Sequence, residues 1–114
     1  MAQARALLDT CASPALAVVL DVANLLTPAT LAQQHAIVDE ALAQLADAIV
    51  LVHAKETPAP PHTGECALGQ GVVDFAYLAA ALHRHTNRGA IIMHGVAEAA
   101  TPRGLEYLRG IFSR

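Results

Sequence analysis

One carboxylate and two imidazoles occupy equivalent places in this sequence. Asp21, His53 and His94 each directly follow a short run of apolar residues. Such runs are typical of buried parallel β-strands, and the chemistry of α/β folds collects just beyond the carboxyl ends of these strands. Because carboxylate oxygens and imidazole nitrogens both ligate divalent transition metals, the pattern predicts a metal site formed by Asp21, His53 and His94.

The predicted ligand set has a chemical preference and an alternative explanation. One Asp and two His suit zinc, manganese, cobalt or iron better than calcium. A polar residue that ends a strand can also simply begin a loop, which is the alternative for each residue taken singly. Three such residues at equivalent strand ends favour the metal site, because neighbouring parallel strands end on one rim.

Three further polar residues lie close to the predicted ligands in sequence. Asn24 can orient the Asp21 carboxylate or bind a substrate hydroxyl, or it can be a turn residue bonded to its own backbone. Lys55 and Glu56 follow His53 and point in opposite directions if the strand continues. Lys55 suits a substrate anion, the alternative being a solvated surface lysine. Asn24, Lys55 and Glu56 are therefore the candidate substrate-binding residues.

The segment after the second apolar run holds weaker candidates. His62 and Glu65 are candidate outer ligands, although loop residues of these types are usually only solvated. The Gly-Gln-Gly sequence at 69–71 resembles half of a dinucleotide fingerprint, but it follows a loop and lacks the third glycine. These glycines instead indicate a tight backbone path close to a ligand or to the sheet.

Composition narrows the class of protein. The 114 residues are 54% hydrophobic and carry a formal net charge of −3, which suits one domain with a core. The seven Lys and Arg residues form no basic stripe, which argues against nucleic acid as a partner. No apolar run approaches the roughly 20 residues that cross a bilayer, so no membrane partner is expected. Cys11 and Cys66 form no C-x-x-C pair, and without a secretory segment a reducing, cytoplasmic location is expected.

The elements that must position these residues alternate along the chain. Helices are expected over 2–10, for about twenty residues after Thr27–Pro28, from Asp74 to near residue 86, and from Thr101–Pro102 onward. Strands are expected over 17–20, 49–52 and 90–93, with a long loop over 55–73. The order α-β-α-β-α-β-α implies a parallel sheet. A closed (β/α)₈ barrel needs about 250 residues, so the chain looks like an incomplete unit.

Four segments carry a family resemblance: LDVAN at 20–24, VHAKE at 52–56, GQGVVDF at 69–75 and IIMHG at 91–95. In order and spacing they resemble the C-terminal part of a xylose isomerase-like TIM barrel, within the sugar phosphate isomerase/epimerase proteins. The resemblance covers nearly the whole chain. It implies an α/β fold that is a partial (β/α)₈ barrel, with about three parallel strands and flanking helices. This would form a single domain over 1–114, corresponding to about strands six to eight.

The resemblance also implies residue roles. In that family a divalent metal at the barrel mouth binds a ketose or aldose, and two glutamates beside it transfer a proton. Asp21 and His53 match metal ligands, and the implied ion is Mn, Mg, Co or Zn. Asn24 stands where many members carry a substrate-contacting histidine, and Lys55 with Glu56 matches a charged pair. His94 replaces the usual glutamate that is both ligand and acid/base group, so it is the candidate third ligand and catalytic residue.

These implications give the expected function. It is sugar or sugar phosphate isomerisation or epimerisation at a divalent metal. The other family glutamate belongs to a strand that would precede residue 1, so the isolated chain is expected to be weak or inactive. The alternative is a non-catalytic interaction module whose open sheet edges pair with a second copy or a separate N-terminal half-barrel. A relative of abasic-site endonucleases is disfavoured by the sparse positive charge.

Overall fold

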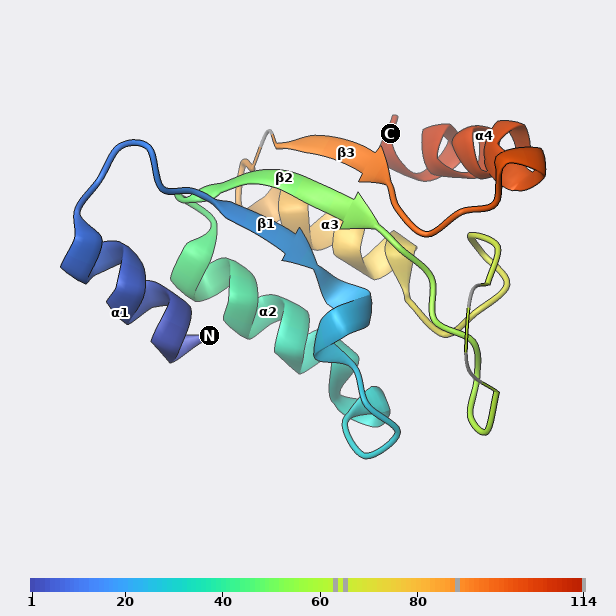
Figure 1. Cartoon of the computed structure of the whole chain (residues 1–114), viewed down its shortest axis with the longest axis horizontal. Coiled ribbons are helices and arrows are strands. Elements are labelled where there is room, and N and C mark those ends of the chain that lie inside the picture. The colour runs from blue at the N-terminus through green and yellow to red at the C-terminus, as the bar shows by residue number, and fades with distance from the viewer. Residues whose placement is uncertain (63, 65, 88, 114) are drawn as a thin grey trace.

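The computed structural model describes residues 1–62, 64, 66–87 and 89–113. Three strands, β1 (Val18–Asp21), β2 (Ile49–Ala54) and β3 (Ala90–Met93), form a parallel sheet in the order β1-β2-β3 (Figure 1). Four α-helices flank it: α1 (Ala2–Cys11), α2 (Gln34–Leu45), α3 (Phe75–Arg84) and α4 (Thr101–Phe112). The expected α/β fold with three parallel strands and flanking helices is confirmed.

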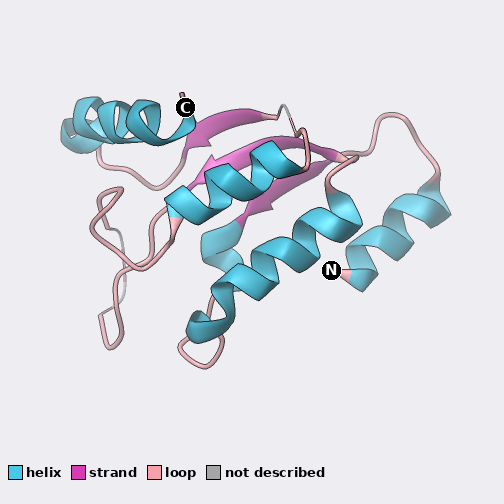
Figure 2. Ribbon diagram, turned by 180° about the vertical axis from the view of Figure 1, so that it is seen from behind, coloured by secondary structure: helices cyan, strands magenta, loops and turns pink. Residues whose placement is uncertain are grey.

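The helices α2 and α3 cover one face of the sheet, as the views from both sides show (Figures 1 and 2). Leu20 and Val52 from the strands meet Leu42 and Leu78 from these helices in one core, each at most 4% exposed. Full burial of side chains this size contributes about 1.5–3 kcal/mol each. Helix α1 packs on α2 and α4 packs on α3. None of the described helices has both the length and the apolar character needed to cross a bilayer.

The opposite face of the sheet, which we call the bare face, has no described helix over it (Figure 1). Side chains alternate between the two faces of a strand, so Val19 and Ile92 lie on this face when Leu20 and Ile91 face the helices. Val19 and Ile92 are each 47% exposed. The bare face is therefore aliphatic in its middle, and the polar residues of the predicted site lie at its carboxyl end.

Some element boundaries differ from those predicted. Asp21 and His53 lie inside their strands, because they pair with each other in the parallel register. The helix expected directly after Thr27–Pro28 begins only at Gln34, after a short 3₁₀ turn at Leu31–Gln33. The reason is local: the Thr27 and Thr30 hydroxyls each accept from the other's backbone N–H, at 3.2 and 2.9 Å, which closes a turn instead of capping a helix.

The last helix begins at Thr101, where it was predicted, but its N-cap is the residue before. Thr101 is its first residue and Ala100 its N-cap, since a 3₁₀ turn at Glu98–Ala100 leads into it. The Thr101 hydroxyl donates back to the Ala97 carbonyl at 3.4 Å instead of accepting from the helix backbone. By contrast, Asp74 caps α3 as predicted, accepting from the Tyr77 N–H at 2.9 Å.

Candidate metal centre

The sheet register brings the three predicted ligands to one edge. Asp21 pairs with His53, and His94 donates its backbone N–H to the Ala54 carbonyl at 3.1 Å, directly after β3. One ligand atom of each of Asp21, His53 and His94 lies within 4.8 Å of the other two. Three paired parallel strands thus hold one carboxylate and two imidazoles at the carboxyl end of the bare face.

The geometry and donor set of this triad fit a metal ion after small movements. His53 Nδ1 lies 3.5 Å from Asp21 Oδ2, and the His53 and His94 rings stack in parallel with centroids 4.6 Å apart. Two ligands about 2.1 Å from one ion are separated by at most about 4.2 Å, so the imidazole rings would have to rotate for all three ligand atoms, now within 4.8 Å of one another, to reach one ion. Three protein ligands leave coordination positions open, as in catalytic rather than structural metal sites.

The three side chains of the triad differ in their exposure to solvent. The Asp21 side chain is 10% exposed and the His53 side chain 26%, whereas His94 is exposed. A ligand would therefore approach from the His94 side.

Asn24 connects the triad to Lys55. A 3₁₀ turn at Val22–Leu25 folds the chain back over Asp21, whose Oδ1 accepts from the Asn24 backbone N–H at 3.2 Å. The Asn24 side chain donates from Nδ2 to Asp21 Oδ2 at 3.0 Å and accepts at Oδ1 from Lys55 Nζ at 2.9 Å. Asn24 therefore orients the carboxylate, and the Lys55 ammonium is held beside the triad instead of extending into solvent.

Glu56 lies apart from the triad. The alternation of Lys55 and Glu56 was predicted for a strand that continues through them, but β2 ends at Ala54. Glu56 is 4% exposed and accepts from the backbone N–H groups of Thr57, Gly69 and Val73, each at 3.0 Å. A Cβ at Gly71 would collide with the Thr57 carbonyl and the Glu56 carboxylate. We call this arrangement of Glu56, Thr57, Gly69, Gly71 and Val73 the loop clamp. Both carboxylate oxygens of Glu56 are therefore bonded to the backbone of this chain. The sequence had instead predicted that Glu56 contacts substrate.

The loop clamp is a feature that residue types alone do not reveal. The Gly-Gln-Gly sequence predicted a close approach of the backbone to another group, and this was the only sign of the loop clamp in the sequence. In the structure the backbone at Gly71 approaches Glu56 and Thr57. Of the weaker loop candidates, His62 is exposed and lines a cavity near Lys55. Glu65 lies outside the described residues.

A polar cluster on the outer side of α2 and α3 was not predicted either. His35 Nε2 lies 2.8 Å from Asp74 Oδ2, and its ring stacks on Tyr77 with centroids 3.7 Å apart. Tyr77 donates to Asp39 at 2.6 Å, and Arg84 also donates to Asp39 at 3.1 Å. The Tyr77 N–H lowers the pKa of Asp74 against the opposing effect of burial, and the bond to Asp39 raises the pKa of Tyr77.

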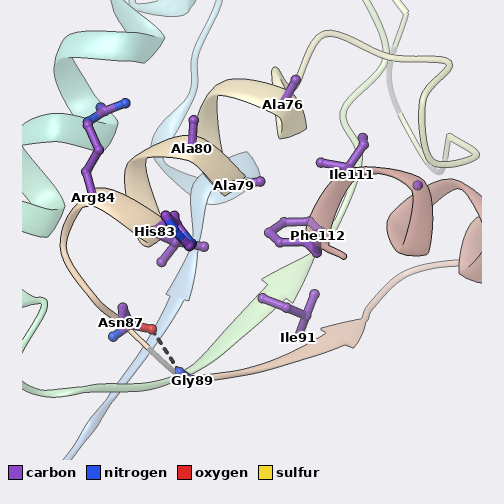
Figure 3. Close-up of a pocket in the computed structure, with 12 residues that line it drawn as sticks. Ala76, Ala79, Ala80, His83, Arg84, Asn87, Gly89, Ile91, Ile111 and Phe112 are labelled. Atoms are coloured by element: carbon purple, nitrogen blue, oxygen red, sulfur yellow. Dashed lines mark hydrogen bonds between the residues drawn. The ribbon is translucent and has the colours of Figure 1, made fainter. Parts of the chain in front are cut away.

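A pocket of about 640 Å³ lies away from the triad, between α3, β3 and the end of α4 (Figure 3). Its walls are mainly Ala76, Ala79 and Ala80 on one side, with Ile91 and Phe112 opposite. It contains none of the triad residues. The chemistry predicted from sequence therefore does not belong to this pocket.

Comparison with known proteins agrees with the parallel α/β fold. A family model described as xylose isomerase-like TIM barrel matches residues 1–111. No curated protein matches the chain. Since the family match covers nearly all of the 114 residues, the chain belongs to the xylose isomerase-like TIM barrel family.

Proposed function

We propose that this chain carries a divalent transition-metal site of the sugar isomerase/epimerase type, with a sugar or sugar phosphate as substrate. The observation that carries the proposal is the convergence of Asp21, His53 and His94 within 4.8 Å at the ends of three parallel strands. Family membership supports it, because the match covers the whole triad.

The residues have distinct roles in this proposal. Asp21 and His53 are the less exposed metal ligands, and His94 is the solvent-exposed ligand. A bound ion supplies Lewis-acid polarisation of a substrate hydroxyl or carbonyl oxygen. Asn24 fixes the Asp21 carboxylate, and Lys55 attracts the anionic or hydroxyl-rich end of the substrate. Zinc, cobalt, manganese and iron suit the donor set better than magnesium, which prefers oxygen ligands.

Proton transfer between neighbouring substrate carbons needs an acid/base group. His94 is the exposed imidazole at the site, and imidazole exchanges protons near neutral pH. Among the described residues Asp21 is the only carboxylate in the triad group, and Glu56 is held in the loop clamp. We therefore expect slow turnover by this chain alone.

The metal assignment is tested by binding measurements. Isothermal titration with Zn²⁺, Co²⁺ and Mn²⁺ should give one site per chain that Asp21→Ala and His53→Ala each weaken at least about tenfold. His85→Ala removes an exposed histidine beyond the end of α3 and serves as the matched control. Equal metal affinity in all four proteins would remove the triad from the proposal.

The reaction is tested separately on the metal-loaded chain. Aldose–ketose and epimer interconversion is followed by NMR over a panel of free and phosphorylated sugars. His94→Ala distinguishes the two roles of that residue: lost metal affinity assigns a ligand, whereas retained affinity with lost turnover assigns the acid/base group. No turnover of any sugar by a chain that binds metal tightly would contradict the isomerase proposal.

A second candidate function is a non-catalytic interaction module, favoured by the bare face. Val19 and Ile92 remain 47% exposed there, and aliphatic sheet surface of this kind is stabilised by contact with another protein surface. A second copy of this chain is the partner that this candidate names. Light scattering should then show a dimer that Ile92→Lys dissociates and that Leu7→Lys, on exposed α1 surface, does not. A monomer at every concentration would exclude it.

A further inference from the structure

A cavity of about 360 Å³ opens next to the proposed metal site. Its apolar lining comes from two loops, the one after β1 and the one after β2. The lining includes Leu26, Pro28, Leu31, Pro58, Pro60 and Val72, and we call the cavity the proline-walled pocket. Lys55 also lines it. Because Lys55 donates to Asn24, which donates to Asp21, only two hydrogen bonds separate the pocket rim from the triad.

Hydrogen bonds hold part of each wall of the proline-walled pocket. On one side, Thr27 and Thr30 hold each other's backbone N–H groups. On the other, Val72 donates to the Thr57 carbonyl at 2.9 Å, and the loop clamp ties the same segment to Glu56. Segments that are already held by hydrogen bonds lose less conformational entropy when a ligand enters.

The lining chemistry indicates what enters. Proline rings have no N–H to donate, so a hydroxyl or phosphate placed against Pro28, Pro58 or Pro60 loses water without gaining a hydrogen-bond donor. The polar side chains of Thr27, Thr57 and His62 also line the pocket. Among the described lining residues the one carboxylate, Glu56, is already bonded to backbone N–H groups. Lys55 adds an ammonium at the rim. A cavity of roughly 150 Å³ is enough for a benzene ring, so the pocket has room for such a group.

We propose that the ligand of this site carries an apolar ring or short alkyl group in the proline-walled pocket, with an anionic or metal-chelating end at Lys55 and the triad. The chelating end rests on the proposed function, whereas the apolar group rests on the pocket. The substrate is then a sugar or sugar phosphate head that is joined to an apolar substituent.

The pocket is tested first without metal, by methyl NMR titration with cyclohexanecarboxylate and with acetate. Cyclohexanecarboxylate should shift the methyl signals of Leu26, Leu31 and Val72 saturably, and bind at least about tenfold more tightly than acetate. Leu31→Ala should weaken it about threefold or more, while Leu105→Ala, an exposed leucine on α4, should not. Absent shifts, or shifts confined to Val19 and Ile92 on the bare face, would overturn the proposal.

The link to the triad is tested on the zinc-loaded chain with acetohydroxamate and 4-phenylbutanohydroxamate. The phenyl compound should bind at least about tenfold more tightly, and Leu31→Ala should reduce that preference. Zinc binding with no preference overturns the link. If zinc does not bind while cyclohexanecarboxylate still shifts the pocket methyls, the proposed function fails and the pocket assignment stands.

Discussion

Asn24 serves two charged groups at once. Its amide nitrogen and backbone N–H both bind the Asp21 carboxylate, and its amide oxygen binds the Lys55 ammonium. These contacts restrict the carboxylate to one orientation before any ion arrives. The amide also keeps Lys55 from pairing directly with Asp21, which would compete with a metal for the same oxygens.

Removing the Asn24 side chain should therefore weaken metal binding without removing a ligand. We expect Asn24→Ala to lower zinc affinity by about tenfold or more, the usual effect of losing a group that orients a metal ligand. Isothermal titration measures this directly. Gln3→Ala, which removes an exposed amide on α1, should leave affinity unchanged. An Asn24→Ala protein that binds zinc as tightly as the parent would show that the orientation does not matter.

In the proposed metal site, we expect His94 to set the preference among metal ions. An imidazole favours zinc and cobalt, whereas carboxylate oxygen favours manganese and magnesium. His94→Glu, which restores the donor expected from the family resemblance, should raise manganese affinity relative to zinc affinity. Competition titrations of the two ions report this ratio. An unchanged ratio would mean that His94 does not ligate the ion.

At the scale of elements, the loop clamp ties the segment after β2 to the end of that strand. Glu56→Gln keeps one acceptor oxygen but replaces the other with an amide NH₂. This NH₂ would face a backbone N–H group that bonds to the carboxylate in the parent, so two donors would meet. We expect the free energy of unfolding to fall by about 1–3 kcal/mol. Urea unfolding checks this, with Glu106→Gln on exposed α4 surface as the control. Equal stability of Glu56→Gln and the parent would contradict the clamp.

The N-cap of α3 gives a pH-dependent prediction. The pKa of Asp74 is lowered below its ordinary value of 3.8, first by the Tyr77 N–H. The stabilisation is therefore present above that value and is lost as the pH falls through the folded-state pKa. Asp74→Ala should lower the free energy of unfolding by about 1 kcal/mol at pH 7. The difference from the parent should shrink below pH 3.8 in urea titrations; a constant difference at all pH values would refute the assignment.

The elements also show what could be predicted from sequence and what could not. The apolar runs located all three strands, because a buried strand needs continuous apolar residues, and Asp74 located a helix start. The Thr27–Thr30 turn was missed because the same residues suit a helix cap. The role of Glu56 was missed because two of its three backbone partners are 13 and 17 residues away, and backbone N–H groups leave no mark on residue type.

In the molecule as a whole, the three strands differ in how many neighbouring strands they pair with and in how deeply they are buried. Strand β2 lies in the middle and pairs on both sides, whereas β3 pairs only with β2 among the described residues. None of the four residues of β3 is fully buried, and they alternate between exposed and half-buried. An edge strand with so little buried surface belongs to the least stable part of a fold.

The position of His94 directly after β3 gives metal binding a second consequence, in folding. An ion held by Asp21, His53 and His94 cross-links the three strands at one end, as a staple would. At a metal concentration 100 times the dissociation constant this stabilises the native state by about 2.7 kcal/mol. Amide hydrogen exchange should slow most at Ile91, Ile92 and Met93 when zinc is added, and hardly at all in His94→Ala. Uniform slowing of amide exchange throughout the chain would count against a cross-link at the strand ends. Slowing confined to β3 would mean that metal supply controls how long this strand stays paired.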